Sequence, residues 1–318
     1  MAIFGIVAIL AIAFALSTSR SSINLRTVSI ALALQVGLAV VIIYLPWGQD
    51  ALAAVVRSVQ HVINYANDGI AFVFGDQITP SLGFTIAFNV LPVIVFFAAL
   101  MSALYYLGVM QVFVGVVGGG LQKLLKTSRA ESVSAASNIF VGHTDAPLVV
   151  RPFLANMTES ELFAVMTGGC ATIAGGVMMA YATMGVDLGY LLTASFMSAP
   201  GGLLMAKILV PETAVPVDVS ASQLEADEDR PANLFEAIGN GALTGMQIAF
   251  SVGAMLIAFV GIIYKLTGLL GWVGSLFGLD GLTLQWILGQ RLAPIAWLIG
   301  VPWQEATAAG SLIGQKFV

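Results

Sequence analysis

The sequence predicts an all-α, polytopic membrane protein with two re-entrant helical hairpins, interfacial helices and broken helices. Of its 318 residues, 58% are hydrophobic and only 9% are charged, whereas a soluble domain carries about 25% charged residues. So few charges cannot cover a surface in water, and the mean hydropathy of +0.95 agrees with a lipid environment. Polar residues and prolines interrupt the apolar sequence near residues 137–152 and 300–305, and these two interruptions predict the hairpins.

The composition argues against several other classes of protein. The 12 basic residues are scattered and form no basic stripe, which argues against nucleic-acid binding. The single cysteine, Cys170, cannot form an internal disulfide and is interpreted as a small apolar residue inside a helix. The two histidines, His61 and His143, make no metal-ligand cluster with it.

The sequence of the N-terminal part predicts helices of different kinds. Residues 2–17 lack the positive start of a signal peptide and predict a short first membrane helix. Residues 27–47 predict a second one. The stretch 51–76 mixes apolar with polar and charged residues, which is typical of amphipathic helices at the membrane interface. The apolar run 84–120 exceeds the roughly 20 residues that a membrane requires, so it must tilt or extend beyond the bilayer.

Four further stretches follow the first interruption. Two apolar runs, 161–185 and 188–210, are separated by the short "GVDLG". The segment 211–233 is acidic and is interpreted as a solvated loop, and another apolar run covers 239–276. Lys and Arg set the orientation. With the N-terminus outside, outer loops keep only Arg57 and Lys265, while the inner side receives Arg20, Arg26, Lys123, Lys126, Arg129, Lys207 and Arg230.

The segment 130–157 is too polar and too broken for one span. "AESVSAASNIFV" is helical in character, "GHTDAP" breaks it, and "LVVRPFLANM" begins again, which predicts two half-helices that meet at a tip. The end of the chain repeats this design: apolar arms flank "VPW", and Glu305 follows the break. Two interrupted segments in corresponding positions indicate an inverted-repeat transporter whose site lies between them.

The polar residues at the first break carry the candidate chemistry. Asp145 costs about 2.5–3.5 kcal/mol to insert in a membrane, so it either accepts hydrogen bonds from a sugar or base, or caps the second half-helix. His143 either binds a planar base or is a buried histidine whose ring nitrogens are hydrogen-bonded within the protein. Asn138 and Thr144 offer uncharged oxygens, although Asn138 could also join two helices. Arg151 is interpreted as structural.

A second polar patch is "GGCATIAGG", residues 168–176. Its glycines permit an unwound turn, at which Thr172 and nearby carbonyls would offer oxygen ligands to an alkali cation. Close packing of small residues between helices explains the same glycines.

These motifs resemble those of the concentrative nucleoside transporters. "NIFVGHTDAPLVVRPF" is similar to the first hairpin of that family, N-x-F-x-G-Q-T-E-A-P-L-V-V-R-P. "FNVLPVIVFFAALMSALYYLG" resembles its long scaffold helix, "ATIAGGV" its broken helix, and "GVPWQEATAAGSLIGQK" its second hairpin. The resemblance runs from near residue 1 to the last residue.

The resemblance implies a homotrimer in the bacterial inner membrane that imports nucleosides with sodium by an elevator-type motion. The implied parts are N-terminal helices, interfacial helices and a long scaffold helix (1–120), the first hairpin with two transport-domain spans (121–210), an acidic cytoplasmic loop (211–233), a second scaffold helix (234–277) and the second hairpin (278–318). The family has two more spans beyond the second hairpin, so the sequence ending at Val318 is expected to be C-terminally truncated.

The resemblance also implies a site. Substrate contacts would come from Gly142, His143, Thr144 and Asp145 on the first hairpin, Val177 on the broken helix and Glu305 on the second hairpin. Sodium ligands would be the side chains of Asn138 and Thr172 and the carbonyls of Val141 and Ile173.

The sequence departs from the family at two positions of the site. His143 replaces Gln and Asp145 replaces the longer Glu, so base preference is open. Protons instead of sodium remain an alternative. A membrane-embedded enzyme with His143 and Asp145 as acid and base is a remote one, because residues two apart do not face each other on a helix.

Overall fold

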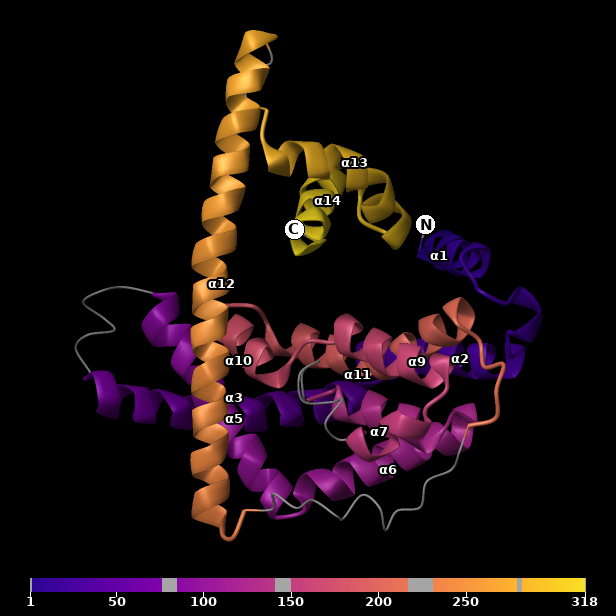
Figure 1. Ribbon diagram of the computed structural model, residues 1–318, viewed down its shortest axis with the longest axis vertical. Coiled ribbons are helices and arrows are strands. Elements are labelled where there is room, and N and C mark those ends of the chain that lie inside the picture. Colours follow the sequence, from indigo (N-terminus) through magenta and orange to yellow (C-terminus); the bar gives the residue numbers. More distant parts are fainter. Residues whose placement is uncertain (1, 76–84, 141–149, 217–230, 279–281, 318) are drawn as a thin grey trace. The chain divides into compact units, whose positions relative to one another are not determined.

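The computed structural model describes residues 2–75, 85–140, 150–216, 231–278 and 282–317, and every regular element in these ranges is a helix (Figure 1). The all-α prediction is therefore confirmed. Among the described residues, five helical stretches are long and apolar enough to cross a membrane: Leu25–Tyr44, Ile86–Tyr106, Glu159–Thr183, Leu188–Leu209 and Leu234–Leu276. The chain divides into two compact units, residues 17–251 and residues 1–16 with 252–318.

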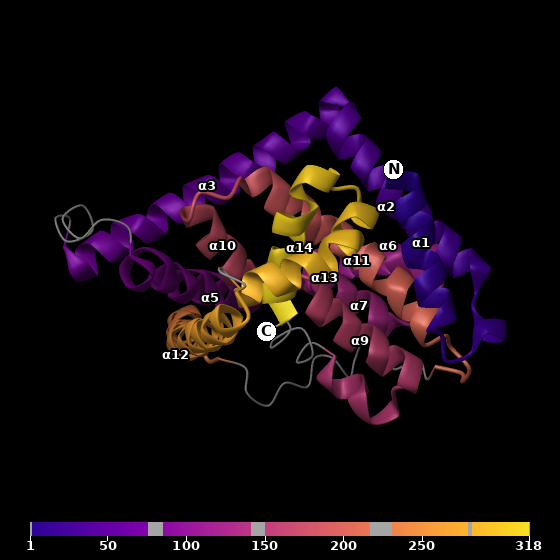
Figure 2. The ribbon, with the colours of Figure 1, turned by 90° about the horizontal axis from the view of Figure 1, so that it is seen from above.

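The larger unit begins with a short 3-10 turn, η1 (Arg20–Ser22), and two helices that meet at a corner (Figure 2). Helix α2 (Leu25–Tyr44) begins where the side chain of Asn24 accepts hydrogen bonds from two backbone N–H groups, and Pro46 begins α3 (Pro46–Phe74). Helix α3 buries Ile63, Ala66 and Ile70 at helical spacing and is not among the candidate spans. This agrees with the predicted amphipathic segment, although the segment forms one helix.

The expectation that the run 84–120 forms a single tilted or extended span is wrong. The run contains a short π-helix, η2 (Ile86–Val90), followed by α5 (Leu91–Tyr106) and α6 (Val109–Leu125). The break is at Gly108, whose φ of 80° lies in the left-handed region that favours glycine. Its backbone N–H bonds back to Tyr105, which ends α5, and α6 begins directly after it. Apolar composition alone does not distinguish one helix from two.

The predicted broken helix is confirmed. Helix α9 (Glu159–Ala171) ends at Thr172, which has an extended backbone, and α10 (Gly175–Thr183) begins after Ala174. Helix α11 (Leu188–Leu209) follows the short connection, and the Asp187 side chain caps its first turn. Helix α11 packs against both α2 and α9, so it holds the broken helix inside the unit. The acidic cluster of the following loop lies outside the described residues.

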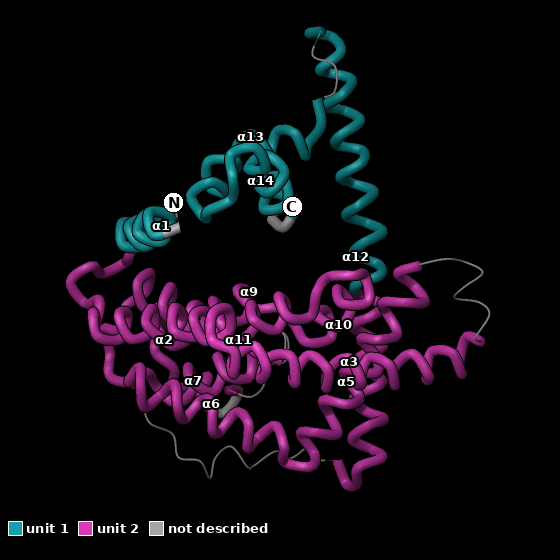
Figure 3. The backbone as a smooth tube through the Cα atoms, turned by 180° about the vertical axis from the view of Figure 1, so that it is seen from behind, with its two compact units in different colours: residues 1–16, 252–318 teal, residues 17–251 magenta. Residues whose placement is uncertain are grey.

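The smaller unit contains α1 (Ala2–Ala15) and a helical hairpin (Figure 3). The 43-residue α12 (Leu234–Leu276) runs through the division between the units. Helices α13 (Leu284–Ile299) and α14 (Trp303–Phe317) pack tightly along their length and are joined by residues 300–302. At about 1.5 Å per residue each is shorter than the roughly 30 Å bilayer core. The second predicted hairpin is therefore present as two short antiparallel arms.

Candidate site for a cation and a nucleoside

The first predicted hairpin begins with a helix that cannot cross a membrane. Helix α7 (Arg129–Ser137) has nine residues, so it rises about 13 Å, less than half of a bilayer core of roughly 30 Å. Every residue from Ala130 to Ser137 is buried, although the helix is rich in serine. Ser128 and Glu131 form a capping box that starts it. A buried polar helix of this length must end inside the protein.

The two arms of the first hairpin pack against each other, which confirms the prediction of a re-entrant segment. Ala130 and Val133 of α7 pack in one cluster with Val150 and Phe153 from the returning arm. The returning arm contains a 3-10 turn, η3 (Arg151–Asn156), and leads into α9. The tip itself, residues 141–149, lies outside the described residues. The predicted contacts Val141, Gly142, His143, Thr144 and Asp145 all belong to it.

Asn138 lies at the buried end of α7. Its side chain is fully buried, and neither its Oδ1 nor its Nδ2 has a hydrogen-bond partner among the described residues. A β-carbon added at Gly168 of α9 would come within 3.0 Å of Asn138 Nδ2, so the amide faces the backbone of that helix. A buried polar group without a partner costs about 1–3 kcal/mol. This amide is therefore arranged to meet a ligand or a group of the tip.

The break between α9 and α10 lies beside Asn138. The Thr172 hydroxyl donates to the carbonyl of Gly168 at 3.0 Å. The two side chains that are predicted to bind the cation, Asn138 and Thr172, therefore both lie next to Gly168. The backbone N–H of Gly175 donates to the carbonyl of Phe140 at 2.9 Å. This bond joins the end of the first arm to the start of α10.

The remaining predicted residues are placed as follows. Ile173 and Val177 are half-buried, one in the break and one on α10. Glu305 is exposed in the first turn of α14, in the other unit. The described part of the site thus brings the cation candidates Asn138 and Thr172 together at Gly168, and Ile173 follows Thr172 in the chain.

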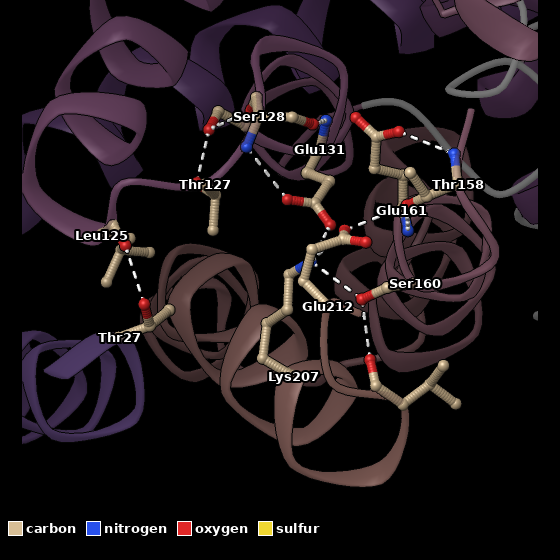
Figure 4. A network of polar contacts seen from close by, with 12 residues as sticks. Thr27, Leu125, Thr127, Ser128, Glu131, Thr158, Ser160, Glu161, Lys207 and Glu212 are labelled. Atoms are coloured by element: carbon tan, nitrogen blue, oxygen red, sulfur yellow. Dashed lines mark hydrogen bonds and ion pairs between the residues drawn. The ribbon is translucent and has the colours of Figure 1, made fainter. Parts of the chain in front are cut away.

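A buried ionic network lies at the opposite ends of α7 and α9 (Figure 4). The Lys207 ammonium pairs with Glu131 and lies 3.3 Å from Glu212 Oε2, and it donates to Ser160 Oγ at 2.9 Å. This network was not predicted from the sequence. The available signals were a lysine at the end of an apolar run and two S/T-x-x-E capping boxes, which begin at Ser128 and Thr158.

Three family models match the chain. They are described as the N-terminus of Na+ dependent nucleoside transporters (residues 4–77), nucleoside recognition (87–187) and the C-terminus of Na+ dependent nucleoside transporters (190–318).

The chain is similar over nearly its whole length to several transporters. It is 55% identical to an uncharacterized transporter of Haemophilus influenzae over 99% of this chain and 76% of the relative. It is 46% identical to the nucleoside permease NupC of Helicobacter pylori, again over 99% and 76% of the two chains. It is 37% identical to sodium/nucleoside cotransporter 2 of Rattus norvegicus over 98% of this chain and 47% of the relative.

The fold matches solved structures of the transporter CNTnw in several states. The inward-facing, substrate-bound structure has a TM-score of 0.94 and 52% identity, covering 99% of this chain and 75% of the other. A doubly substituted, outward-facing form has a TM-score of 0.96 and 52% identity, covering 99% and 76%.

Proposed function

The chain belongs to the concentrative nucleoside transporter family, and we propose that it imports nucleosides together with sodium ions. Its relatives are permeases and cotransporters, so the chain is an integral membrane transporter and not a membrane-embedded enzyme. We place it in the bacterial inner membrane as a homotrimer, with the scaffold formed by residues 1–120 and 234–277 and the moving part by 121–210 and 278–318.

One observation carries the choice of sodium: the amide of Asn138 is fully buried and has no hydrogen-bond partner among the residues that the structure describes. Its oxygen is an uncharged, hard ligand of the kind that alkali cations take. Thr172 supports the same assignment, because its hydroxyl hydrogen is used on Gly168 and its lone pairs remain free to face a cation. The carbonyls of Val141 and Ile173 complete the proposed set. The description of the matching family models as Na+ dependent supports sodium as well.

The nucleoside contacts are proposed for the tip and its neighbours. The carboxylates of Asp145 and Glu305 would accept hydrogen bonds from substrate hydroxyl or amine groups, and His143 and Thr144 would add further hydrogen bonds beside Gly142. Val177 would pack against the base. Bound sodium would order the end of the first arm, and the substrate would then meet a preorganised Asp145. Such coupling is reciprocal, so substrate must also raise the affinity for sodium.

The proposal is tested by uptake of radiolabelled nucleosides into proteoliposomes with a panel of unlabelled competitors. External sodium is replaced by choline at fixed pH, and the expected result is loss of concentrative uptake. Uptake that continues in choline and follows an imposed pH gradient would instead establish proton coupling.

Two variants separate the ion from the substrate. Asn138→Ala should raise the sodium concentration for half-maximal uptake by more than about tenfold, which corresponds to about 1.4 kcal/mol of cation binding. Asp145→Asn should abolish uptake while the trimer, measured by light scattering in detergent, still assembles. Wild-type uptake by Asp145→Asn would remove that residue from the site.

A further inference from the structure

The two helices that carry the proposed cation side chains begin in the same way. Helix α7 starts with a capping box in which Glu131 Oε2 accepts from the Ser128 N–H at 3.0 Å. Helix α9 starts with a second one, in which Glu161 Oε2 accepts from the Thr158 N–H at 2.8 Å. Both helices run from these caps towards the cation candidates: Asn138 ends α7, and Thr172 ends α9.

Lys207, in the last turn of α11, joins the two starting points. Its ammonium pairs with Glu131 of α7 and donates to Ser160 in the first turn of α9, while Ser160 donates to the carbonyl of Val210. Glu212 adds a second link, because it contacts Lys207 and accepts from the Thr158 hydroxyl at 2.9 Å. Figure 4 shows the ammonium between these groups. Lys207 is only 8% exposed, so water screens these contacts little.

Close packing along α7 and α9 would carry a displacement from the caps to the opposite ends. A β-carbon at Gly118 of α6 would lie 3.2 Å from the Ser132 carbonyl of α7, and one at Gly202 of α11 would lie 3.5 Å from Gly168 Cα of α9. A close-packed interior has low compressibility and transmits strain through such contacts. A sliding of α7 against α9 at the caps would therefore appear as a misplacement of Asn138 against Thr172.

We infer that Lys207 is a positioning residue for the cation site: it fixes the starts of α7 and α9 against α11 and so sets the distance between Asn138 and Thr172. It contacts neither the cation nor the nucleoside. The inference rests on the proposed sodium site. It predicts that loss of Lys207 lowers the affinity for sodium more than it lowers the affinity for the nucleoside.

The charges around Lys207 decide which variants can test this. Glu131, Glu161 and Glu212 all lie in the network, so removing only the ammonium leaves carboxylates without compensation in a buried place. Removing one partner of a buried pair costs about 3–5 kcal/mol, whereas neutralising both partners together is often tolerated. The double variant Lys207→Met with Glu131→Gln is therefore the main test. Glu212→Gln is a milder one, because the Glu212 side chain is 24% exposed.

The experiment measures uptake into proteoliposomes as a function of sodium and, at saturating sodium, as a function of nucleoside. In the double variant we expect the half-saturating sodium concentration to rise about tenfold, a loss of about 1.4 kcal/mol, while the nucleoside KM changes by less than about twofold. Glu212→Gln should raise the half-saturating sodium concentration by about threefold. Lys207→Arg, which keeps the charge, should lie close to the wild type. The control Lys123→Met, at an exposed lysine of α6, should match the wild type.

Three outcomes would contradict the inference, and they are distinguishable. Wild-type uptake that is equal in sodium and in choline would reject the proposed sodium coupling and, with it, the positioning role. A sodium-dependent wild type whose double variant and Glu212→Gln variant both keep wild-type sodium affinity would reject the positioning role alone. Equal losses of sodium affinity and nucleoside affinity would also reject it, because they indicate general structural damage.

Discussion

The carbonyl of Phe140 accepts a hydrogen bond from the backbone N–H of Gly175 at 2.9 Å, which ties the end of the first hairpin arm to the first turn of α10. Phe140 follows the proposed cation ligand Asn138 by two residues, and Gly175 precedes the proposed base contact Val177 by two. A cation that orders the first end would therefore also order the second. This bond is a direct structural link between the proposed ion and nucleoside sites.

Gly175→Ala should break that link. The new β-carbon would lie 2.3 Å from the Phe140 carbonyl oxygen and 2.4 Å from the Phe97 ring, so the two segments must separate. We expect a loss of about 1–3 kcal/mol in stability, as for other overpacked sites, and a large loss of uptake. The unfolding temperature in detergent and uptake in proteoliposomes measure the two effects. The adjacent Gly176→Ala is the control, since its β-carbon would make an ordinary contact at 3.4 Å with Ile94.

Sodium binding should require the hydroxyl group of Thr172 and not its methyl group. Thr172→Val keeps the shape but removes the oxygen, so the half-saturating sodium concentration should rise about tenfold, or about 1.4 kcal/mol. Thr172→Ser keeps the oxygen and should stay within about twofold of the wild type, a difference of about 0.4 kcal/mol. Sodium titration of nucleoside uptake distinguishes them. Equal sodium affinities in the two variants would exclude Thr172 as a ligand.

The second hairpin depends on the close contact of its arms. A β-carbon at Gly310 of α14 would lie 2.7 Å from the backbone nitrogen of Ala293 in α13. Gly310→Ala should therefore lower the unfolding temperature in detergent, with a cost of about 1–3 kcal/mol. Gly261→Ala on α12 is the matched control, because its β-carbon would have no described atom within 4 Å. Equal unfolding temperatures would show that the arms can separate without cost.

The sequence predicted the breaks of the chain better than its connections. Both hairpins could be predicted, because prolines, glycines and polar residues mark them in an otherwise apolar sequence. The interruption between α9 and α10 was predicted from the family resemblance, since the glycines of residues 168–176 alone also fit close helix packing. The division at Gly108 was missed, since an isolated glycine in a helical run is usually tolerated. Only its backbone φ of 80° shows that the chain turns there.

Ion pairs between residues that are distant in the chain were also not predicted from the sequence. Lys207 and Glu131 are far apart in the chain, and nothing local to either residue identifies the other as its partner. Burial raises the pKa of the Glu131 carboxyl above its ordinary value, and the Lys207 ammonium opposes that rise. Such a pair follows from the packing of α7 against α11, which a single sequence does not reveal. The same reasoning applies to Asn138, because only the three-dimensional structure shows that its buried amide has no hydrogen-bond partner in the described ranges.

Glu305 provides a test of the nucleoside site that does not depend on the first hairpin. Its carboxylate is exposed in the first turn of α14, directly after the break of the second hairpin. Nothing in the described part of the protein uses it in an ion pair, so its replacement should leave folding intact. Glu305→Gln keeps the shape but would weaken the proposed charge-assisted hydrogen bond to a substrate hydroxyl, here assigned to the ribose, and a hydrogen bond of this kind is worth about 1.5–3 kcal/mol. The nucleoside KM should therefore rise by more than about tenfold, while the unfolding temperature in detergent stays at the wild-type value. A nucleoside analogue that lacks the ribose hydroxyls should bind the wild type and Glu305→Gln equally, whereas a preserved preference for the hydroxyls in the variant would assign their recognition to other residues.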